Sequence, residues 1–307
     1  MTENQYDLLI VGTGPAGSTA ALYGQRLGLN VVVFGDTPGG ITYMIDNIMN
    51  LPGFLGGIPG AEFGVKLFQQ AQMEGATFTM ARLDRLDYEG DGFTGTDAND
   101  LTYTAPCAIV ASGRVPKRLP VAHSEMKGIN FCSVCDGPLY RDKNATLAVV
   151  GNDNAAGQHA MTLSRIAKKV FLICRSETHK MDTVHQELIA QQNNIEVLKG
   201  TEVIGFKGLD FVESLIVKAR EGNKSEIPVD GVFLAIGWKP NLRMLQFKAD
   251  TNTDGYLKTD ASLMTSIPGL FAAGDIREKN LYQVLTACAD GARAAKYVSE
   301  FIEKSNG

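Results

Sequence analysis

The sequence predicts an α/β protein with mostly parallel sheets, and three observations support that fold class. Its 33 glycines fall mainly at the ends of short apolar runs, as the turns of a chain that alternates strands and helices require. Two of these runs, 7–11 and 146–150, each lead into a glycine-containing loop and then a helical segment. With 44% hydrophobic and 21% charged residues, the 307-residue chain is long enough for two domains with separate cores.

The charge balance argues against two classes of partner. A net charge of −5 gives no broad basic surface for nucleic acid or for an anionic membrane. The first residues, MTENQYDLLIVG, lack the basic and apolar regions of an export signal, and no apolar run reaches the length of a bilayer. We therefore expect a cytoplasmic protein, whose five cysteines would stay reduced apart from any catalytic disulfide.

The first apolar run and the loop after it have the pattern of a dinucleotide site. The strand enters G-x-G-x-x-G at Gly12, Gly14 and Gly17. Gly12 permits the tight turn, Gly14 lets a pyrophosphate approach the backbone, and Gly17 lets the helix pack closely on the strand. With Pro15 and Ala16 between them, these residues predict that the helix N-terminus binds the phosphates of a dinucleotide.

The second apolar run, 146–150, repeats this arrangement, so the chain is predicted to contain two Rossmann-like units. Its loop begins Gly151-Asn152-Asp153, and Asp153 stands where a glycine would admit a pyrophosphate. A carboxylate that faces a diphosphate is repulsive unless a cation intervenes. The second groove is therefore expected to bind a dinucleotide poorly.

Cys132 and Cys135 form a C-x-x-C pair. The same spacing makes half of a zinc site, but no second pair completes one, and no metal is expected. A carboxyl at Asp136 can give a proton to a departing thiolate, which favours thiol–disulfide exchange over a structural pair. Of the three isolated cysteines, Cys107 and Cys288 are interpreted as core thiols, and Cys174 is the candidate for a reachable thiol.

Together with several other motifs, these residues resemble the low-molecular-weight thioredoxin reductases over nearly the whole chain. The other matches are Gly39-Gly40, Asn50-Leu-Pro-Gly-Phe54, Val110-Ala-Ser-Gly113, the run from Pro268 to Asp275, and Gln283 with Thr286. The resemblance implies FAD, a homodimer, and thioredoxin or a similar protein disulfide as the substrate. It assigns the FAD contacts to Gly12, Gly14, Pro15, Ala16, Gly17, Gly40, Asn50, Ala111, Gly113, Gly274, Asp275, Gln283 and Val284. Gly35 stands where the family often has the acid that binds the ribose, and Asp36, one residue later, is expected to bind it instead.

The resemblance also implies how the domains are ordered. Residues 1–116 and 245–307 would form a discontinuous FAD domain, and residues 117–244 an inserted NAD(P)-binding-like domain that carries the cysteine pair. By position, Cys135 would be the flavin-proximal sulfur, Cys132 the sulfur that attacks the partner disulfide, and Asp136 the acid. The spacing of the two cysteines alone does not assign these roles.

Departures from the family pattern bear on the electron donor. The basic His-Arg-Arg run that binds the 2′-phosphate of NADPH in the family is reduced here to Arg175, flanked by Cys174 and Ser176. Most of the guanidinium fork that matches phosphate oxygens is lost, so we expect weak NADPH binding. In the alternative interpretation, Arg175 and Lys180 suffice for an ordinary NADPH-dependent thioredoxin reductase. In the FAD half, Tyr282 replaces an Arg.

Without NADPH the enzyme needs another electron donor. Ferredoxin is the leading candidate, because thioredoxin reductases that use ferredoxin are a branch of the family that this chain resembles. Basic residues that could meet an acidic ferredoxin are Lys117, Arg118, Arg141, Lys143, Arg165, Lys168 and Lys169. A second flavin in the altered groove is another hypothesis, in which Trp238 would stack on a ring close to Asn152, Asp153 and Arg175. Two further functions stay open: a dithiol oxidase, and a flavin-bearing redox sensor without turnover.

Overall fold

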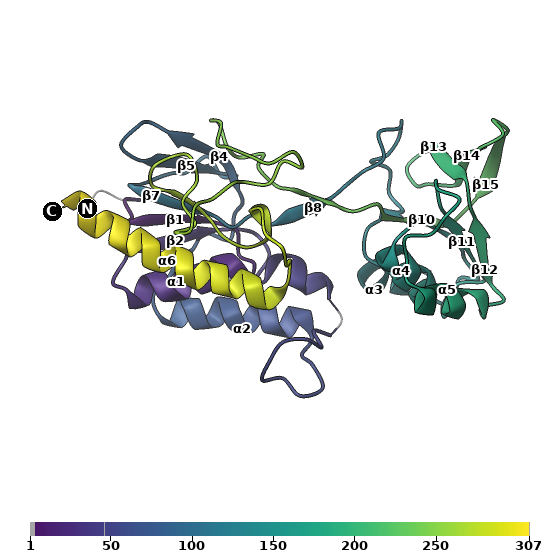
Figure 1. Ribbon diagram of the computed structural model, residues 1–307, viewed down its shortest axis with the longest axis horizontal. Coiled ribbons are helices and arrows are strands. Elements are labelled where there is room, and N and C mark those ends of the chain that lie inside the picture. Colours follow the sequence, from purple (N-terminus) through teal and green to yellow (C-terminus); the bar gives the residue numbers. More distant parts are fainter. Residues whose placement is uncertain (1–3, 46, 307) are drawn as a thin grey trace. The chain divides into compact units, whose positions relative to one another are not determined.

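The computed structural model describes residues 4–45 and 47–306, without the side chains of Cys135 and Asn306. The chain forms two compact units, one made of Met1–Val115 with Lys239–Gly307 and the other of Pro116–Trp238. Figure 1 follows the chain through both units, from its first strand to the long C-terminal helix.

Five parallel strands form the central sheet of the first unit, in the order β18-β7-β1-β2-β3. They are β1 (Leu8–Val11), β2 (Val31–Phe34), β3 (Thr77–Phe78), β7 (Cys107–Val110) and β18 (Leu270–Ala272). β1 and β2 are fully buried runs of Leu, Ile, Val and Phe, the composition of parallel strands covered on both faces. Because β18 comes from the second chain segment and pairs with β7, this sheet joins the two segments of the unit.

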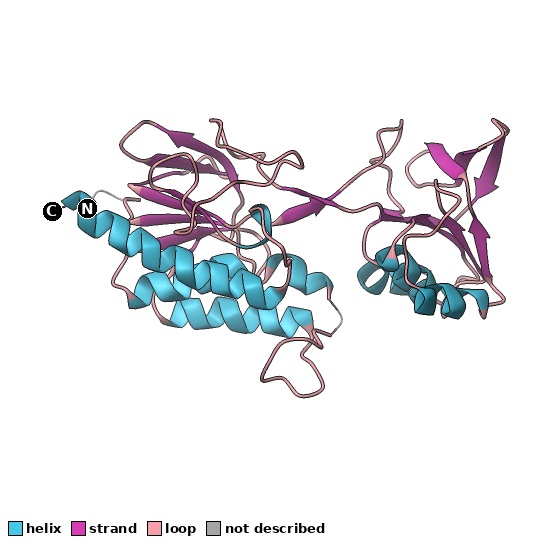
Figure 2. Cartoon of the chain, in the orientation of Figure 1, coloured by secondary structure: helices cyan, strands magenta, loops and turns pink. Residues whose placement is uncertain are grey.

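Helices cover one face of that sheet and a small antiparallel sheet covers the other (Figures 1 and 2). Successive strand residues point to opposite faces, so Leu8 and Val31 pack with the helices, whereas Leu9 and Val32 pack with the small sheet. The covering elements are α1 (Pro15–Arg26), α2 (Gly60–Met73), α6 (Val284–Asn306), β4 (Leu83–Tyr88), β5 (Phe93–Asp97) and β6 (Thr102–Ala105). Two short helical turns, η1 (Gly40–Met44) and η3 (Gly274–Ile276), lie in the connections.

The second unit repeats this plan around a parallel sheet of order β12-β11-β10-β16-β9. Its strands are β9 (Ile129–Asn130), β10 (Thr146–Gly151), β11 (Lys169–Ile173), β12 (Ile195–Leu198) and β16 (Gly231–Ala235). One face carries α4 (Asn154–Ser164) and α5 (Thr183–Ala190), and the other the antiparallel strands β13 (Thr201–Lys207), β14 (Ser214–Ala219) and β15 (Lys224–Pro228). The short helices α3 (Ser133–Asp136) and η2 (Gly137–Tyr140) precede β10. The predicted α/β fold with two Rossmann-like units is confirmed.

Two paired strands, β8 (Arg114–Pro116) and β17 (Trp238–Pro240), carry the chain between the units. The return to the first unit comes at Lys239, six positions before the boundary expected at 245. The intervening segment is hydrogen-bonded to the first unit, because Ser112 Oγ donates to Asn241 O (2.7 Å) and the Leu86 amide donates to Met244 O (2.8 Å). These hydrogen bonds, which no sequence motif predicts, place the segment with the first unit.

Within the described ranges of the chain, no helix is long and apolar enough to cross a membrane. The same ranges contain no group of three or more His, Cys, Asp or Glu side chains arranged to hold a metal ion.

Candidate active site

The first glycine loop connects β1 to α1 and leaves the start of that helix without a side-chain cap. Gly12 has a φ of +118°, and a Cβ there would lie 2.4 Å from Ala111 O. A Cβ at Gly17 would lie 1.8 Å from Gly12 O, so only glycine permits this close approach. Gly14 precedes the helix with no side-chain cap hydrogen bond, and Pro15 begins it. The first amides of α1 are thus open to an anion such as a phosphate.

Segments far apart in the sequence meet at this loop. A Cβ at Gly40 would lie 3.2 Å from Gly14 Cα, and a Cβ at Gly274 would lie 2.7 Å from Ala16 Cβ. Both glycines have a left-handed backbone, with φ of +53° and +79°. The start of η1 and the C-terminal motif therefore lie against the start of α1, and together they form one cradle.

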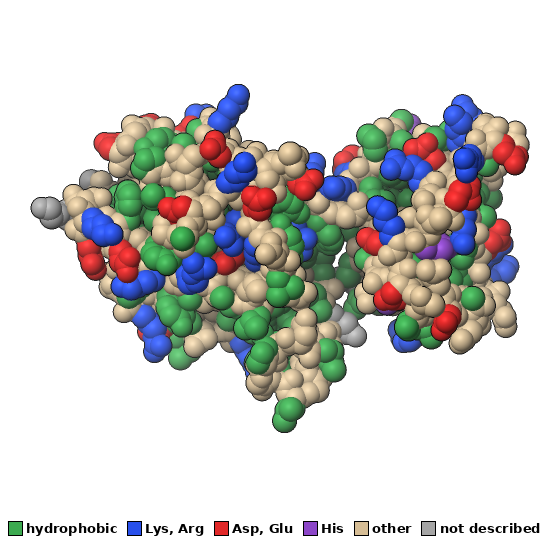
Figure 3. All heavy atoms as spheres, viewed as in Figure 1, with side chains coloured by type: hydrophobic (Ala, Val, Ile, Leu, Met, Phe, Trp, Pro, Cys, Tyr) green, Lys and Arg blue, Asp and Glu red, His purple; other side chains and the backbone are tan. Residues whose placement is uncertain are grey.

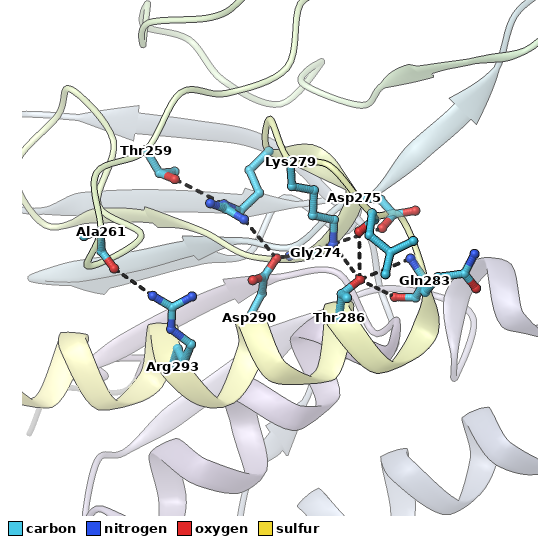
Figure 4. Close-up of polar contacts among 11 residues, drawn as sticks. Thr259, Ala261, Gly274, Asp275, Lys279, Gln283, Thr286, Asp290 and Arg293 are labelled. Atoms are coloured by element: carbon cyan, nitrogen blue, oxygen red, sulfur yellow. Dashed lines mark hydrogen bonds and ion pairs between the residues drawn. The ribbon is translucent and has the colours of Figure 1, made fainter. Parts of the chain in front are cut away.

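Asn50 and Gln283 are also brought together, since Asn50 Nδ2 donates to Gln283 Oε1 (2.9 Å). Gln283 directly precedes Val284, the first residue of α6. The Gln283 amide donates to Thr286 Oγ1 (3.2 Å), which fixes the turn into that helix (Figure 4). The resemblance implies that the backbone near Gln283 meets the flavin ring, and this turn places that backbone beside the cradle's C-terminal motif.

Three further expected FAD contacts follow β7 and β2, the two strands that flank β1 in the parallel sheet. Ala111 and Gly113 come after β7; the Ala111 amide donates to Val11 O (2.8 Å), and Gly113 has a φ of +62°. Asp36 comes after β2, with its Oδ2 3.3 Å from Arg82 Nε. Both side chains of this pair are more than half exposed, so a ribose hydroxyl can replace Arg82 at small cost.

Asp275 lies in η3 between two cations. Arg114 Nη2 is 2.8 Å from Asp275 Oδ2, and Lys279 Nζ is 3.3 Å from Asp275 Oδ1. Lys279 is close to Asp275 Oδ1 but is not aligned for a hydrogen bond. Among the described residues, Asp275 Oδ1 is therefore buried without a hydrogen-bond partner, and Arg114 Nε is likewise buried without one. Such orphaned atoms are rare in folded proteins. Together with the open start of α1 and the glycine cradle, the free acceptor at Asp275 Oδ1 fits a large polar ligand such as FAD.

The cysteine pair lies at the start of α3 in the second unit. Cys132 is disulfide-bonded; the side chain of its predicted partner, Cys135, lies outside the described part of the structure. The Asp136 amide donates to Cys132 O (3.0 Å). Burial raises the pKa of the Asp136 carboxyl above its ordinary value, and a hydrogen bond from the Cys132 backbone offsets only part of this rise. A carboxyl with an increased tendency to hold a proton thus lies next to the disulfide.

The three other cysteines are free thiols. Cys107 is fully buried, and burial raises the pKa of its thiol to about 12. Cys174 is also fully buried, with a pKa raised to about 11 by burial, and its Sγ donates to Gly151 O (3.2 Å). The interpretation of Cys174 as a reachable thiol is therefore wrong, because this residue directly follows β11, is fully buried and bonds to the second glycine loop. Cys288 is partly buried in α6.

In the second glycine loop, the protein's own carboxylate occupies the start of the helix. Asp153 is the N-cap of α4, and its Oδ1 accepts a hydrogen bond from the Ala156 amide (3.2 Å). The tight turn itself is kept, since a Cβ at Gly151 would lie 2.4 Å from Ala235 O. Asp153 therefore does more than repel a phosphate: it takes up an amide that a phosphate would use and partly neutralises the positive end of the helix.

A neighbouring segment is hydrogen-bonded to the same loop. Asn152 Nδ2 donates to Thr178 O (3.0 Å), and the Lys180 amide donates to Asn152 O (2.9 Å). Asn154 Nδ2 donates to Asp182 Oδ2 (3.1 Å), and the Asp182 amide donates back to Asn154 Oδ1 (2.8 Å). These four bonds tie residues 178–182 to the loop at which a pyrophosphate would bind.

The other two residues expected in the second groove have different surroundings. Arg175, the guanidinium left of the family's basic run, is 84% exposed, and its Nη1 lies 4.0 Å from Glu202 Oε1. Trp238 is half-buried in β17, at the boundary between the units. Arg175 therefore already has a carboxylate neighbour that a 2′-phosphate would have to displace.

Residues 6–291 match the model of the pyridine nucleotide-disulphide oxidoreductases. The chain belongs to this family. A thioredoxin reductase of Listeria innocua is 32% identical over 98% of this chain and 95% of its own length, and one of Bacillus subtilis is 32% identical over 98% and 96%. Membership implies FAD and the chemistry of a thioredoxin reductase-like flavoprotein disulfide oxidoreductase.

Solved structures agree with this assignment. The thioredoxin reductase of Lactococcus lactis superposes with a TM-score of 0.86 at 28% identity, over 97% of this chain and 99% of its own. A ferredoxin-flavin thioredoxin reductase of Clostridium acetobutylicum superposes with a TM-score of 0.54 at 26% identity, over 98% and 99%. The chain is thus similar both to thioredoxin reductases whose names give no electron donor and to one that is named for ferredoxin.

Sequence reasoning missed the two cations on Asp275. Arg114 directly follows the Val110–Gly113 motif and Lys279 lies four positions after Asp275, but neither spacing is a known signal. Only the fold brings the start of β8 next to η3.

Proposed function

We propose that this protein is a FAD-dependent reductase of thioredoxin or a similar protein disulfide, with ferredoxin rather than NADPH as its electron donor. One observation carries the choice of donor: the start of α1 has no side-chain cap, whereas the start of α4 is capped by Asp153. An uncapped helix start is a ready anion site, and a carboxylate at the same place both occupies and neutralises it. The first unit is therefore suited to a dinucleotide and the second is not.

FAD would supply the capacity to accept electrons and pass them to a disulfide. The open amides of α1, with Gly14 and Gly40, would bind its pyrophosphate, and Asp36 would bind a ribose hydroxyl. Asp275, whose Oδ1 has a free lone pair, would accept from the ribityl chain. The backbone at Gln283 and Val284 would meet the ring system.

The dithiol would transfer the electrons to the substrate. In the reduced enzyme, the Cys132 thiolate attacks one sulfur of the partner disulfide, forming a mixed disulfide and releasing the first partner thiolate. Cys135 then attacks Cys132 Sγ, which releases the second partner thiolate and re-forms the enzyme disulfide, so that the partner is reduced by two electrons. Asp136, with its raised pKa, would give a proton to a departing thiolate.

Two observations support a protein donor. The ferredoxin-flavin thioredoxin reductase of Clostridium acetobutylicum is similar in structure to nearly the whole of this chain. In addition, basic side chains flank the second unit's dithiol region: Arg141 and Lys143 follow η2, and Arg165 and Lys168 follow α4, all exposed. The Lys168 amide donates to Ala145 O (2.9 Å), which brings the two basic stretches together. On the face of the molecule drawn in Figure 3, both basic (blue) and acidic (red) side chains are exposed.

Anaerobic mixing of the purified protein with NADPH, NADH or reduced ferredoxin tests this function. Bleaching of the flavin absorbance by ferredoxin, followed by reduction of thioredoxin, is the expected result. Rapid bleaching by micromolar NADPH would instead establish the alternative, an ordinary NADPH-dependent thioredoxin reductase like the relatives at 32% identity. The second flavin and the homodimer stay predictions, which flavin release on denaturation and light scattering would check.

A further inference from the structure

A cluster of five charged side chains lies where β8, η3 and the start of α6 meet in the first unit. Its members are Arg114, Asp275, Arg277, Lys279 and Asp290. Figure 4 shows Asp275 and Lys279 close to the turn at Gln283, where the flavin ring is expected, and Asp290 further along α6. The cluster is therefore part of the wall of the proposed FAD site.

The two carboxylates do not balance the three cations. Asp290, whose side chain is 8% exposed, lies 3.4 Å from both Arg277 Nη1 and Lys279 Nζ, and it also accepts from the Gly274 amide (3.1 Å). Asp275 lies between Lys279 and Arg114. Three cations against two carboxylates leave one positive charge. Because the side chains of Arg114 and Lys279 are only 23% and 8% exposed, water screens that charge less than it would at the surface.

Arg114 is held in place from two sides. Its Nη2 is 2.8 Å from Asp275 Oδ2, and its guanidinium carbon lies 4.7 Å from the centroid of the Tyr282 ring, a cation–π arrangement. The Tyr282 ring is 5.4 Å from the ring of Tyr256, and Lys279 Nζ is 5.6 Å from the Tyr282 centroid. Tyr282 was noted in the sequence as replacing an Arg of the family. In the structure this tyrosine supports a different arginine, which supplies a cation from β8.

We propose that Arg114 and Lys279 are charge-tuning residues that raise the reduction potential of the bound flavin, with Asp275 and Tyr282 positioning Arg114. This inference rests on the FAD site of the proposed function. Reduction adds negative charge to the flavin ring, and a poorly screened positive charge close to the ring favours the more negative form. A raised potential makes the flavin a better electron acceptor and a weaker donor to the disulfide, so the cluster also influences the direction of electron flow.

The potential of the bound flavin is measured directly, by anaerobic equilibration with a reference dye. Arg114→Met should keep FAD and lower the equilibrium constant for flavin reduction about tenfold, which is about 30 mV for a two-electron couple. Arg114→Lys, which keeps the charge, should stay within about threefold of the parent. The matched control is Arg293→Met, since Arg293 lies on α6 but donates to Ala261 O (2.8 Å) outside the cluster (Figure 4).

An unchanged potential in flavin-loaded Arg114→Met would overturn the proposal. Loss of FAD from Arg114→Met but not from Arg114→Lys would also overturn it, because Arg114 would then bind the cofactor rather than tune it. If Arg114→Met does not fold, Lys279→Met is measured instead. It should also lower the potential of the bound flavin, and an unchanged potential in Lys279→Met would refute the proposal. A parent protein that binds no FAD would refute the proposed function itself, which separates the two failures.

Discussion

Replacing Asp153 by glycine should open the second helix start to NADPH while leaving the fold intact. The substitution removes the Asp153 Oδ1 bond to the Ala156 amide (3.2 Å). Glycine is itself an acceptable N-cap, so the loss of stability should be only a few tenths of a kcal/mol, whereas alanine would cost about 1 kcal/mol. Thermal unfolding should therefore shift by no more than about 1 °C.

The gain in NADPH affinity follows from the charge that is removed. Two unit charges about 4 Å apart repel by about 1 kcal/mol in water and about 4 kcal/mol at an effective dielectric constant of about 20. Asp153 is exposed, so the lower part of that range applies. Since about 1.4 kcal/mol is a factor of ten, Asp153→Gly should lower the Kd for NADPH about tenfold. Adding Ser176→Arg supplies part of the missing phosphate fork and should increase the effect.

Two choices make the test specific. Asp153→Ser is the matched control, because serine can still cap the helix but carries no charge; it should give only the electrostatic part of the gain. Cys174 is left unchanged, although the family has a histidine there, because this residue is fully buried and a larger side chain would overpack the core at a cost of roughly 1–3 kcal/mol.

The assay is anaerobic flavin reduction followed over a range of NADPH concentrations. The parent should be reduced slowly even at millimolar NADPH, and Asp153→Gly with Ser176→Arg should reach the same rate at far lower concentration. If all variants share one NADPH dependence, the capped helix start does not limit binding. If the parent is already fast at micromolar NADPH, the reasoning from Asp153 is wrong altogether.

Three other predictions concern the thiols and their acid. Cys132→Ser should bind FAD normally but lose thioredoxin reduction, whereas reduction at the parent rate would remove Cys132 from the pathway. Asp136→Asn should slow thiol exchange by a factor of roughly 10²–10⁴. Because the raised pKa of Asp136 keeps its carboxyl protonated to higher pH, the rate of the parent protein should fall as the pH rises through that pKa. A stopped-flow pH profile of the variant should lack this fall. Iodoacetamide at pH 8 should label Cys132 only after reduction and should leave Cys107 and Cys174 unlabelled. Both of these thiols are buried, and their pKa values of about 12 and about 11 keep them protonated. Mass spectrometry of the peptides would show which cysteines are labelled.

The fold was predictable from the sequence because its signals are local. β1 and β10 are short apolar runs that end in glycine loops. A Cβ at Gly12 would clash with Ala111 O and a Cβ at Gly151 with Ala235 O, which explains why glycine is needed at both places. The inserted position of the second unit followed from the resemblance. The boundary at 239 rather than 245 did not, because it depends on backbone bonds such as that from Leu86 to Met244.

The candidate site was predictable only in part, for a physical reason. Glycines and cysteines mark positions where backbone geometry or chemistry demands one residue type, whereas a charged side chain acquires its partner from the fold. Asp153 was recognised as a misplaced charge, but not as a helix cap with its own amide partner. Arg114 carried no signal at all, since its contact with Asp275 joins positions in β8 and η3.

The glycine loop has a different role in each of the two Rossmann-like units. In the first, Gly14 leaves the amides of α1 open to a ligand; in the second, Asp153 supplies the anion from the protein itself. A helix start satisfied by its own side chain gains stability without a ligand, and residues 178–182 add four hydrogen bonds to the same loop. Such a unit no longer needs a nucleotide to complete its loop. Its role in catalysis is then to carry the dithiol and not to bind a nucleotide. In that case electrons must reach FAD by a route that does not pass through the second groove.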